Sequence, residues 1–539
     1  MIDTRDSRNG ITQLEPATVP AAPGPRASMA ATFIRNVTAG WASIVIGIAF
    51  AFVLAPLTVR TLGNVHYGIW SLLMQVTGYL WLFDFGVRES VVKYVAQYHA
   101  VDDNAGIQNI VRTAISMYSG VSLATLAVAA IFAAALPYVF NIPADEVVTS
   151  RITALLVGGT VAQTFVFNVF VGIVMALQKF YLISRLGIYL TVGRGLLMYA
   201  LLSAGYGLIM LAMVQFSSTL LSNLLVYRLA RRQLPQISVG LVWPRRTEAM
   251  KLFNYGKYVL LSNFGDKLVF ASASIVIGIF QPISMLAYYA IGASLIEHLR
   301  TFIASMGAIL NPISSGLEAR RESDKLGRIL MAGAKASVLL GLPVCIGFMV
   351  LGREFIRLWI GPEYAAAAGT VLAVLAFGNM VGLPYYMISG VLYGLGRHRV
   401  VAWSRLLEGL TNLAISVVLV QRYGVVGVAI GAVIPHLVVV GVVLPGVLPR
   451  WIRLDVRAYY ISTYLRPLIA ATPFLLACAF IARQVPPGNL FIFFASIALA
   501  LPLYAAPVWT VALTAEERTA AREYLSRKLA RRTPAREAV

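Results

Sequence analysis

The chain has 539 residues, of which 59% are hydrophobic and only 12% charged, with a formal net charge of +21. Soluble globular proteins carry about 25% charged residues, so this composition excludes a soluble domain and indicates an integral membrane protein. The excess of Lys and Arg is explained by cytoplasmic loops that face anionic lipid, and no nucleic-acid partner is expected. The two cysteines, Cys345 and Cys478, lie far apart in apolar runs, which disfavours a disulfide framework or a metal site.

Apolar runs follow a polar, proline-rich segment over residues 1–32, which is typical of a flexible cytoplasmic tail. At roughly 20 residues per crossing, the runs predict an all-α polytopic membrane protein with fourteen transmembrane helices. The predicted crossings are 33–58, 66–86, 112–137, 151–176, 187–204, 208–228, 256–280, 287–311, 333–351, 366–393, 403–421, 425–446, 465–483 and 490–512.

The stretch from Pro56 to Tyr98 shows an arrangement that recurs along the chain, in which two predicted crossings are joined by a short turn. One crossing ends near Pro56, a short turn around Gly63 follows, and a second crossing ends in Asp84-Phe-Gly86. The next residues place apolar side chains on one helical face, which predicts an amphipathic helix in the membrane interface.

The loop charges predict the orientation. With the N-terminus inside, few of the 44 Lys and Arg residues fall on the outer side, so both termini are expected in the cytoplasm. The outer loops are short, and the longest spans residues 352–365. The outer arginines are Arg60, Arg151, Arg353, Arg357, Arg422 and Arg483.

An internal repeat relates the two halves at an offset of roughly 220 residues, as in many transporters. Tyr206-Gly207 matches Tyr423-Gly424 at the same topological position. Six crossings per repeat is an even number, so the lobes are expected to be related by an axis along the membrane normal. The predicted lobes are 33–228 and 256–446, joined by a basic cytoplasmic linker, 229–255, and followed by an extra helix pair, 447–512, and a basic tail helix, 513–539, that opens with a capping box.

The order of short motifs Arg60-Thr-Leu-Gly63, Tyr67-Gly68, Asp84-Phe-Gly86 and Leu358-Trp-Ile-Gly361 resembles the Wzx-type polysaccharide and O-antigen flippases. These belong to the multidrug/oligosaccharidyl-lipid/polysaccharide exporter superfamily. The resemblance implies an alternating-access carrier in the bacterial inner membrane that moves an undecaprenyl-pyrophosphate-linked glycan outward. It also implies a place beside the polymerase and glycosyltransferases of one pathway, and we expect neither enzymatic activity nor a cofactor.

Basic residues at membrane depth are the candidates for substrate binding. Placing a charged side chain in the bilayer costs at least about 2.5–3.5 kcal/mol, so a function or a partner is expected for each of Arg194, Lys267 and Arg300. If they face a central cavity, they can bind the pyrophosphate or an acidic sugar. The alternative is that each only pairs with a neighbouring helix.

Acidic residues in the crossings are the candidates for coupling or gating. Glu408 either faces Arg194 across the cavity as a gate or binds a proton or cation. Asp266 and Glu297 can titrate during transport, or they can form a self-neutralising network with Lys267 and Arg300.

At the inner end of the second crossing, Asp84 and Arg88 are candidates for an inner gate.

Three alternative functions are weighed. A membrane polymerase or ligase is disfavoured because the outer loops are too short to carry a catalytic domain. A multidrug extruder of the same superfamily is disfavoured by the extra helix pair. A lipid II flippase stays open because its added helices resemble the pair 447–512.

Overall fold

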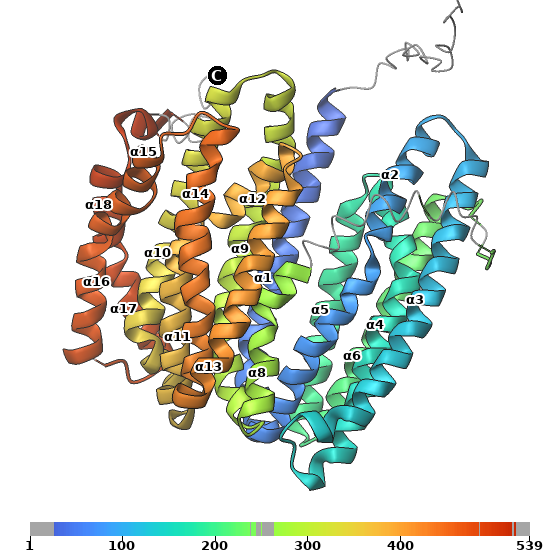
Figure 1. The fold of residues 1–539 in the computed structure, drawn as a ribbon, viewed down its shortest axis with the longest axis horizontal. Coiled ribbons are helices and arrows are strands. Elements are labelled where there is room, and N and C mark those ends of the chain that lie inside the picture. The colour runs from blue at the N-terminus through green and yellow to red at the C-terminus, as the bar shows by residue number, and fades with distance from the viewer. Residues whose placement is uncertain are drawn as a thin grey trace, which may run out of the picture.

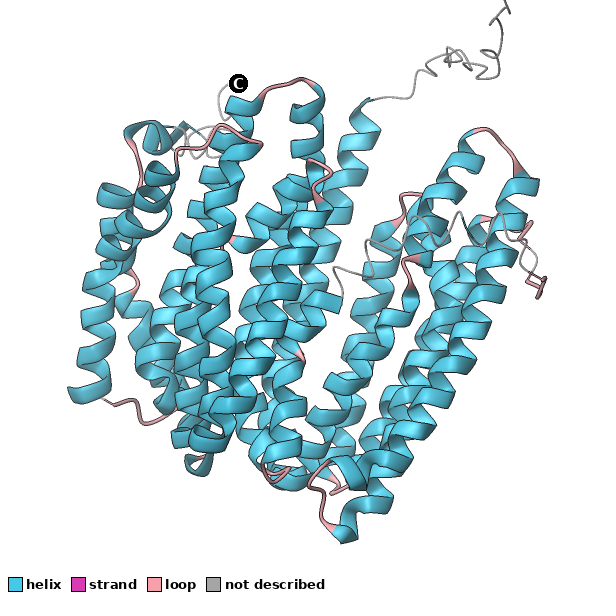
Figure 2. Ribbon diagram, viewed as in Figure 1, coloured by secondary structure: helices cyan, strands magenta, loops and turns pink. Residues whose placement is uncertain are grey.

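The computed structural model of the protein describes residues 26–237, 239–243, 250, 264–484, 486–519 and 522–523, with side chains from Thr38 onward. Within these ranges the regular structure consists of helices, and no strand occurs (Figure 2). The all-α prediction is therefore confirmed. Ten of the described helices are long and apolar enough to cross a membrane. The count of fourteen crossings stays a prediction.

The first part of the chain forms six long helices. They are α1 (Arg26–Leu80), α2 (Val87–Ala100), α3 (Asn104–Val139), α4 (Val147–Ala176), α5 (Phe180–Ser203) and α6 (Leu208–Gln233). We call the described residues 38–237 the N lobe.

The second part continues with helical residues 264–270, which lead into α8. Its helices are α8 (Ser272–Phe280), α9 (Met285–Ala319), α10 (Ser323–Trp359), α11 (Pro362–Gly382), α12 (Tyr385–Gly394), α13 (His398–Val438) and α14 (Leu444–Val447). We call residues 264–450 the C lobe. The remaining helices are α15 (Val456–Tyr460), α16 (Arg466–Gln484), α17 (Leu490–Ala500) and α18 (Pro502–Pro507).

The helices gather in two groups that stand side by side (Figure 1). The groups come together at the lower edge of that view and diverge toward the upper edge, where α2 lies. We call the lower edge the Gly63 end, after the turn in α1, and the upper edge the Asp84 end. Helices α15 to α18 stand on the far side of the C lobe from the N lobe.

Two of the longest helices contain a break at a glycine. Gly63 interrupts α1 with φ 70°, and Gly424 interrupts α13 with φ 54°. Residues with a side chain rarely adopt such positive φ values, so glycine permits the reversal. Gly63 lies in the predicted turn between the first two crossings, and Gly424 lies in the predicted turn between crossings eleven and twelve. Tyr206-Gly207, the other copy of the repeat motif, lies between α5 and α6, which supports the predicted repeat.

Helix α2 is confirmed as a helix, and its buried residues Val87, Val91 and Val95 pack in the core that α3 and α4 share. Its place in the membrane interface stays a prediction. The longest predicted outer loop is instead mostly helical, because α10 continues to Trp359 and α11 begins at Pro362. Hydropathy marks only the apolar part of a helix, whereas backbone hydrogen bonding continues beyond it.

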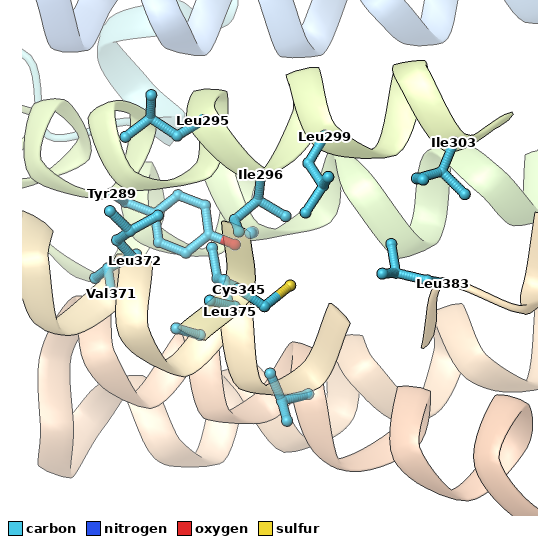
Figure 3. Close-up of a cluster of buried hydrophobic side chains, with 14 of the residues drawn as sticks. Tyr289, Leu295, Ile296, Leu299, Ile303, Cys345, Val371, Leu372, Leu375 and Leu383 are labelled. Atoms are coloured by element: carbon cyan, nitrogen blue, oxygen red, sulfur yellow. The ribbon is translucent and has the colours of Figure 1, made fainter. Parts of the chain in front are cut away.

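The C lobe has a continuous apolar core between α9, α10 and α11. Tyr289 and Ile296 of α9 lie beside Cys345 of α10 and Leu375 of α11 (Figure 3). Cys345 and Cys478 are both free and buried, as expected of small apolar side chains. This close packing fixes the positions of the side chains that α9, α11 and α13 present to the N lobe.

An aromatic cluster attaches the C-terminal helices to both lobes at the Gly63 end. The rings of Phe52 in α1 and Trp359 in α10 stack with centroids 5.0 Å apart, and Phe355 lies 5.4 Å from Phe493 of α17. The Trp359 indole also donates a hydrogen bond to the Phe52 carbonyl at 3.0 Å.

The predicted capping box at Thr514 is confirmed, and it anchors the tail. The Thr514 amide donates to Glu517 Oε2 at 2.8 Å, and the Glu517 amide donates to Thr514 Oγ1 at 3.3 Å. The same carboxylate binds the buried Lys335 ammonium of α10 at 2.6 Å. Burial alone would raise the pKa of Glu517, but the hydrogen bonds from Lys335 and Thr514 hold it below its usual value of 4.5.

The tail is expected to detach in acid. A carboxylate with a lowered pKa stabilises the docked form above its usual value, and that contribution is lost as the pH falls from 4.5 through the lowered value. A fluorophore on Thr519→Cys, in a background without Cys345 and Cys478, should report this release. Glu517→Gln should detach the tail already at pH 7, whereas its neighbour Glu516→Gln should behave as wild type. A docked tail in Glu517→Gln at pH 7 would contradict the assignment.

Candidate functional site

A cavity of about 460 Å³ lies between the N lobe and the C lobe. Its N-lobe wall comes from α1, on the segment between Gly63 and Leu80. Its C-lobe walls come from residues 266–274 and from α9, α11 and α13. This volume falls within the range of small-molecule sites in proteins.

The charge of the cavity is distributed unequally between the lobes. Among the described residues, every Asp, Glu, Lys, Arg and His that lines the cavity belongs to the C lobe, whereas α1 contributes only uncharged side chains. The ionisable lining residues are Asp266, Lys267, Glu297, His298, Arg300, Glu408 and His436. Five of these seven are predicted site residues, and the other two are His298 and His436.

Lys267 reaches from the C lobe to the N lobe. Its Nζ lies 3.1 Å from the position that a Cβ on Gly78 would take, so the absent side chain leaves room for the ammonium. Its backbone carbonyl accepts a hydrogen bond from the Tyr79 hydroxyl at 3.1 Å. Within the described part of the chain, Lys267 Nζ makes neither a hydrogen bond nor an ion pair. A cation held in this way at a cavity wall is available to an anionic ligand.

Arg300 and Glu297 form a pair on one face of α9. Arg300 Nη2 lies 2.6 Å from Glu297 Oε2, as the spacing of three residues predicts. The guanidinium carbon also lies 4.1 Å from the centroid of the Phe270 ring. Glu297 is the more exposed partner, and its carboxylate occupies only part of the hydrogen-bonding capacity of the guanidinium.

Arg405 of α13 connects two acidic residues behind the cavity wall. Its side chain is 1% exposed, its Nε lies 2.9 Å from Asp266 Oδ1, and its Nη1 donates to Glu408 Oε2 at 2.9 Å. The guanidinium carbon also lies 3.4 Å from the centroid of the Tyr385 ring. Arg405 is not among the predicted site residues, although it lies inside the predicted crossing 403–421. Of the alternative network of Asp266, Lys267, Glu297 and Arg300, the Glu297–Arg300 ion pair is formed, whereas Asp266 pairs with Arg405.

His436 joins the two halves of α13. Its Nδ1 lies 2.6 Å from Glu408 Oε1, so Glu408, before the Gly424 break, contacts a residue after it. The ring fits against Gly382 of α11, where a Cβ would overlap Nε2. His436 also lines the cavity, so its imidazole ring connects the buried Glu408 carboxylate with the cavity.

The other predicted site residues lie outside the cavity lining. Arg194 of α5 donates to Gln215 of α6 at 2.9 Å. The expected contact between Glu408 and Arg194 is not formed, since Glu408 contacts Arg405 and His436. Asp84 accepts a hydrogen bond from Tyr118 within the N lobe.

Arg88 pairs at 2.6 Å with Glu89, its neighbour in α2. A role for Asp84 and Arg88 in an inner gate stays a prediction, as does substrate binding by Arg194.

Polar contacts join the lobes at the Gly63 end. Arg60 Nε donates to the Ile360 carbonyl at 2.9 Å, and Asn64 binds the hydroxyls of both Tyr288 and Tyr364. Gly68 of α1 packs directly on the Ile283 carbonyl. The cavity is thus separated from this end by the packed turn of α1.

This arrangement of two helix groups around a central polar cavity is similar to the folds of two solved membrane transport proteins. A solved structure of the lipid II flippase MurJ in an inward closed conformation superposes with a TM-score of 0.69. It is 13% identical and covers 88% of this chain and 98% of MurJ. An inward-facing multidrug resistance transporter of the MATE family matches with a TM-score of 0.58 at 15% identity, over 78% of this chain and 99% of its own.

The chain belongs to the polysaccharide biosynthesis protein family, whose sequence profile matches residues 33–318. A probable low-salt glycan biosynthesis flippase of Haloferax volcanii, Agl15, is 25% identical over 197 residues, which cover 36% of this chain and 42% of the relative. A putative O-antigen transporter of Shigella flexneri is 21% identical over 214 residues, 39% of this chain and 48% of the relative. The chain thus aligns with less than half the length of these curated relatives.

Proposed function

We propose that the protein is a flippase that moves an undecaprenyl-pyrophosphate-linked oligosaccharide from the cytoplasmic to the periplasmic leaflet by alternating access. The cargo is an O-antigen or exopolysaccharide repeat unit, and the membrane is the bacterial inner membrane with both termini in the cytoplasm. The observation that carries the proposal is the position of Lys267 and Arg300 at one cavity between two lobes. The names of the relatives, which are flippases and transporters of glycans, point to the same cargo class.

In this mechanism the pyrophosphate binds Lys267 and Arg300 while the cavity is open toward the cytoplasm. The contacts around Gly63, Asn64 and Arg60 close the opposite end in this state. Transport requires that these contacts break and that the Asp84 end closes. Glu408 and His436 are the proposed coupling pair, because they contact each other at 2.6 Å across the Gly424 break and both line the cavity.

Partners outside the cavity follow from charge and pathway. Anionic lipid would meet the basic cytoplasmic segments. The polymerase and glycosyltransferases of the same pathway would consume and supply the cargo. We propose no catalytic role for the chain.

A lipid II flippase is the second candidate, and a multidrug extruder the third. The lipid II flippase is placed first of these two because the superposition on MurJ spans 88% of this chain, compared with 78% for the MATE transporter. Competition between lipid II and a lipid-linked oligosaccharide in the same transport assay separates the first two candidates.

The anion site predicts a large loss of transport on charge removal. Lys267→Gln and Arg300→Gln should each lower flipping of a fluorescent lipid-linked oligosaccharide in proteoliposomes at least about tenfold, because a hydrogen bond to a charged group contributes about 1.5–3 kcal/mol. Neither variant should complement a flippase-deficient strain, although both should accumulate normally. Arg353→Gln, an exposed arginine at the Gly63 end, is the control and should keep full activity. Full activity in both cavity variants would exclude the anion site.

A further inference from the structure

The N-lobe wall of the cavity is a single face of α1. Its lining residues recur at the three- and four-residue spacing of a helix, and none of them is charged. They are Tyr67, Trp70, Ser71, Met74 and Gln75. This face therefore offers aromatic surface together with neutral hydroxyl and amide groups.

Trp70 is the largest side chain on this face, and part of it packs against the hydrophobic core. Its side chain is half-buried and lines the cavity. Among the described residues, its indole nitrogen makes no hydrogen bond, and its ring has neither an aromatic nor a cationic neighbour. The indole thus presents apolar area and an N–H donor to a polar space, which are groups that a ligand can use.

The position of Trp70 relative to Lys267 restricts what it can contact. Lys267 Nζ lies beside Gly78, eight residues after Trp70 on the same helix. With a rise of 1.5 Å per residue, these two levels are about 12 Å apart along α1. Trp70 lies toward the Gly63 end, so a phosphate at Lys267 places the attached sugar rings, and not a second phosphate, at the level of Trp70.

The chemistry of the wall also restricts the kind of sugar. A pyranose ring has an apolar face of C–H groups, which stacks on an indole, and a rim of hydroxyls. Ser71 and Gln75 lie one and five residues from Trp70 and can bind that rim. Because no cation lies on this face, the wall suits a neutral or N-acetylated hexose better than a uronic acid.

We propose that Trp70 is the stacking platform for the neutral sugar attached to the diphosphate, so that the C lobe binds the phosphate and α1 of the N lobe recognises the sugar. This inference rests on the proposed function, since it presumes a diphosphate at Lys267 and Arg300. It adds a specificity-determining residue and a substrate class to that site.

The experiment compares two soluble probes with the purified full-length protein. Farnesyl diphosphate carries the anion alone, and farnesyl-diphospho-N-acetylglucosamine carries the anion and one sugar. Calorimetry should show tighter binding of the glycosylated probe by the wild type. Trp70→Leu should weaken binding of the glycosylated probe about tenfold and change binding of farnesyl diphosphate less than about twofold. Trp70→Phe should retain part of the additional affinity that the sugar provides, because phenylalanine keeps an aromatic face.

The controls separate this inference from the function on which it rests. Trp403→Leu removes an exposed indole of α13 that is not part of the cavity lining and should leave both affinities unchanged. An unchanged affinity of Trp70→Leu for the glycosylated probe, or an equal loss for both probes, would overturn the stacking role. Unchanged farnesyl diphosphate binding in Lys267→Gln and Arg300→Gln would instead overturn the anion site.

Discussion

Replacing Arg405 with methionine is expected to destabilise the protein by about 3–5 kcal/mol, the usual cost of removing one partner from a buried ion pair. Asp266 and Glu408 would then face each other without the guanidinium that lies 2.9 Å from each of them. A thiol-reactive dye measures the effect, because Cys345 and Cys478 are buried and react only when the protein unfolds.

A triple variant tests the cause of that destabilisation. Arg405→Met combined with Asp266→Asn and Glu408→Gln removes the two acidic charges as well, so most of the lost thermal stability should return. An unfolding temperature of Arg405→Met equal to that of the wild type would show that the cluster does not support the C lobe.

Gly68→Ala is expected to lower the transport rate at least about tenfold. The new Cβ would overlap the Ile283 carbonyl oxygen, and a backbone group cannot rotate away as a side chain can. The lobes must therefore separate at the Gly63 end, which favours a state open on that side. A membrane-impermeant thiol reagent should label Ser71→Cys faster in the Gly68→Ala background, once Cys345 and Cys478 have been replaced.

The matched control for that variant is Gly120→Ala. Gly120 lies inside α3, where a Cβ would meet no neighbour within 4 Å, so transport and labelling should match the wild type. Equal labelling rates in Gly68→Ala and the wild type would contradict a seal at the Gly63 end.

The helices were largely predictable because each membrane crossing leaves an apolar run. The breaks at Gly63 and Gly424 were also predictable, since each falls between two such runs. What hydropathy could not predict is how far a helix continues beyond the lipid. For α10 the apolar run covers 333–351, whereas the helix spans Ser323–Trp359.

The candidate site was predictable where residues lie close in sequence. The pair of Glu297 and Arg300 follows from their spacing on one helix. The contact of Asp266 with Arg405 joins segments far apart in the chain, and only the packing of residues 264–270 on α13 brings them together. Gly265, whose Cβ position lies 2.7 Å from Arg405 Cβ, permits that approach. Arg405 was harder to predict, because it lies only two residues inside the predicted crossing 403–421, next to a basic loop.

The unequal distribution of charge between the lobes has a consequence for membrane voltage. Three acidic and three basic residues compose the C-lobe cluster, namely Asp266, Glu297, Glu408, Lys267, Arg300 and Arg405, so with neutral histidines the empty site has no net charge. A potential of 100 mV contributes about 2.3 kcal/mol for each elementary charge that crosses the membrane. A neutral empty site can then return without electrical work. In the proposed function the loaded protein carries the negative charge of the cargo outward, which is the direction that an inside-negative potential favours.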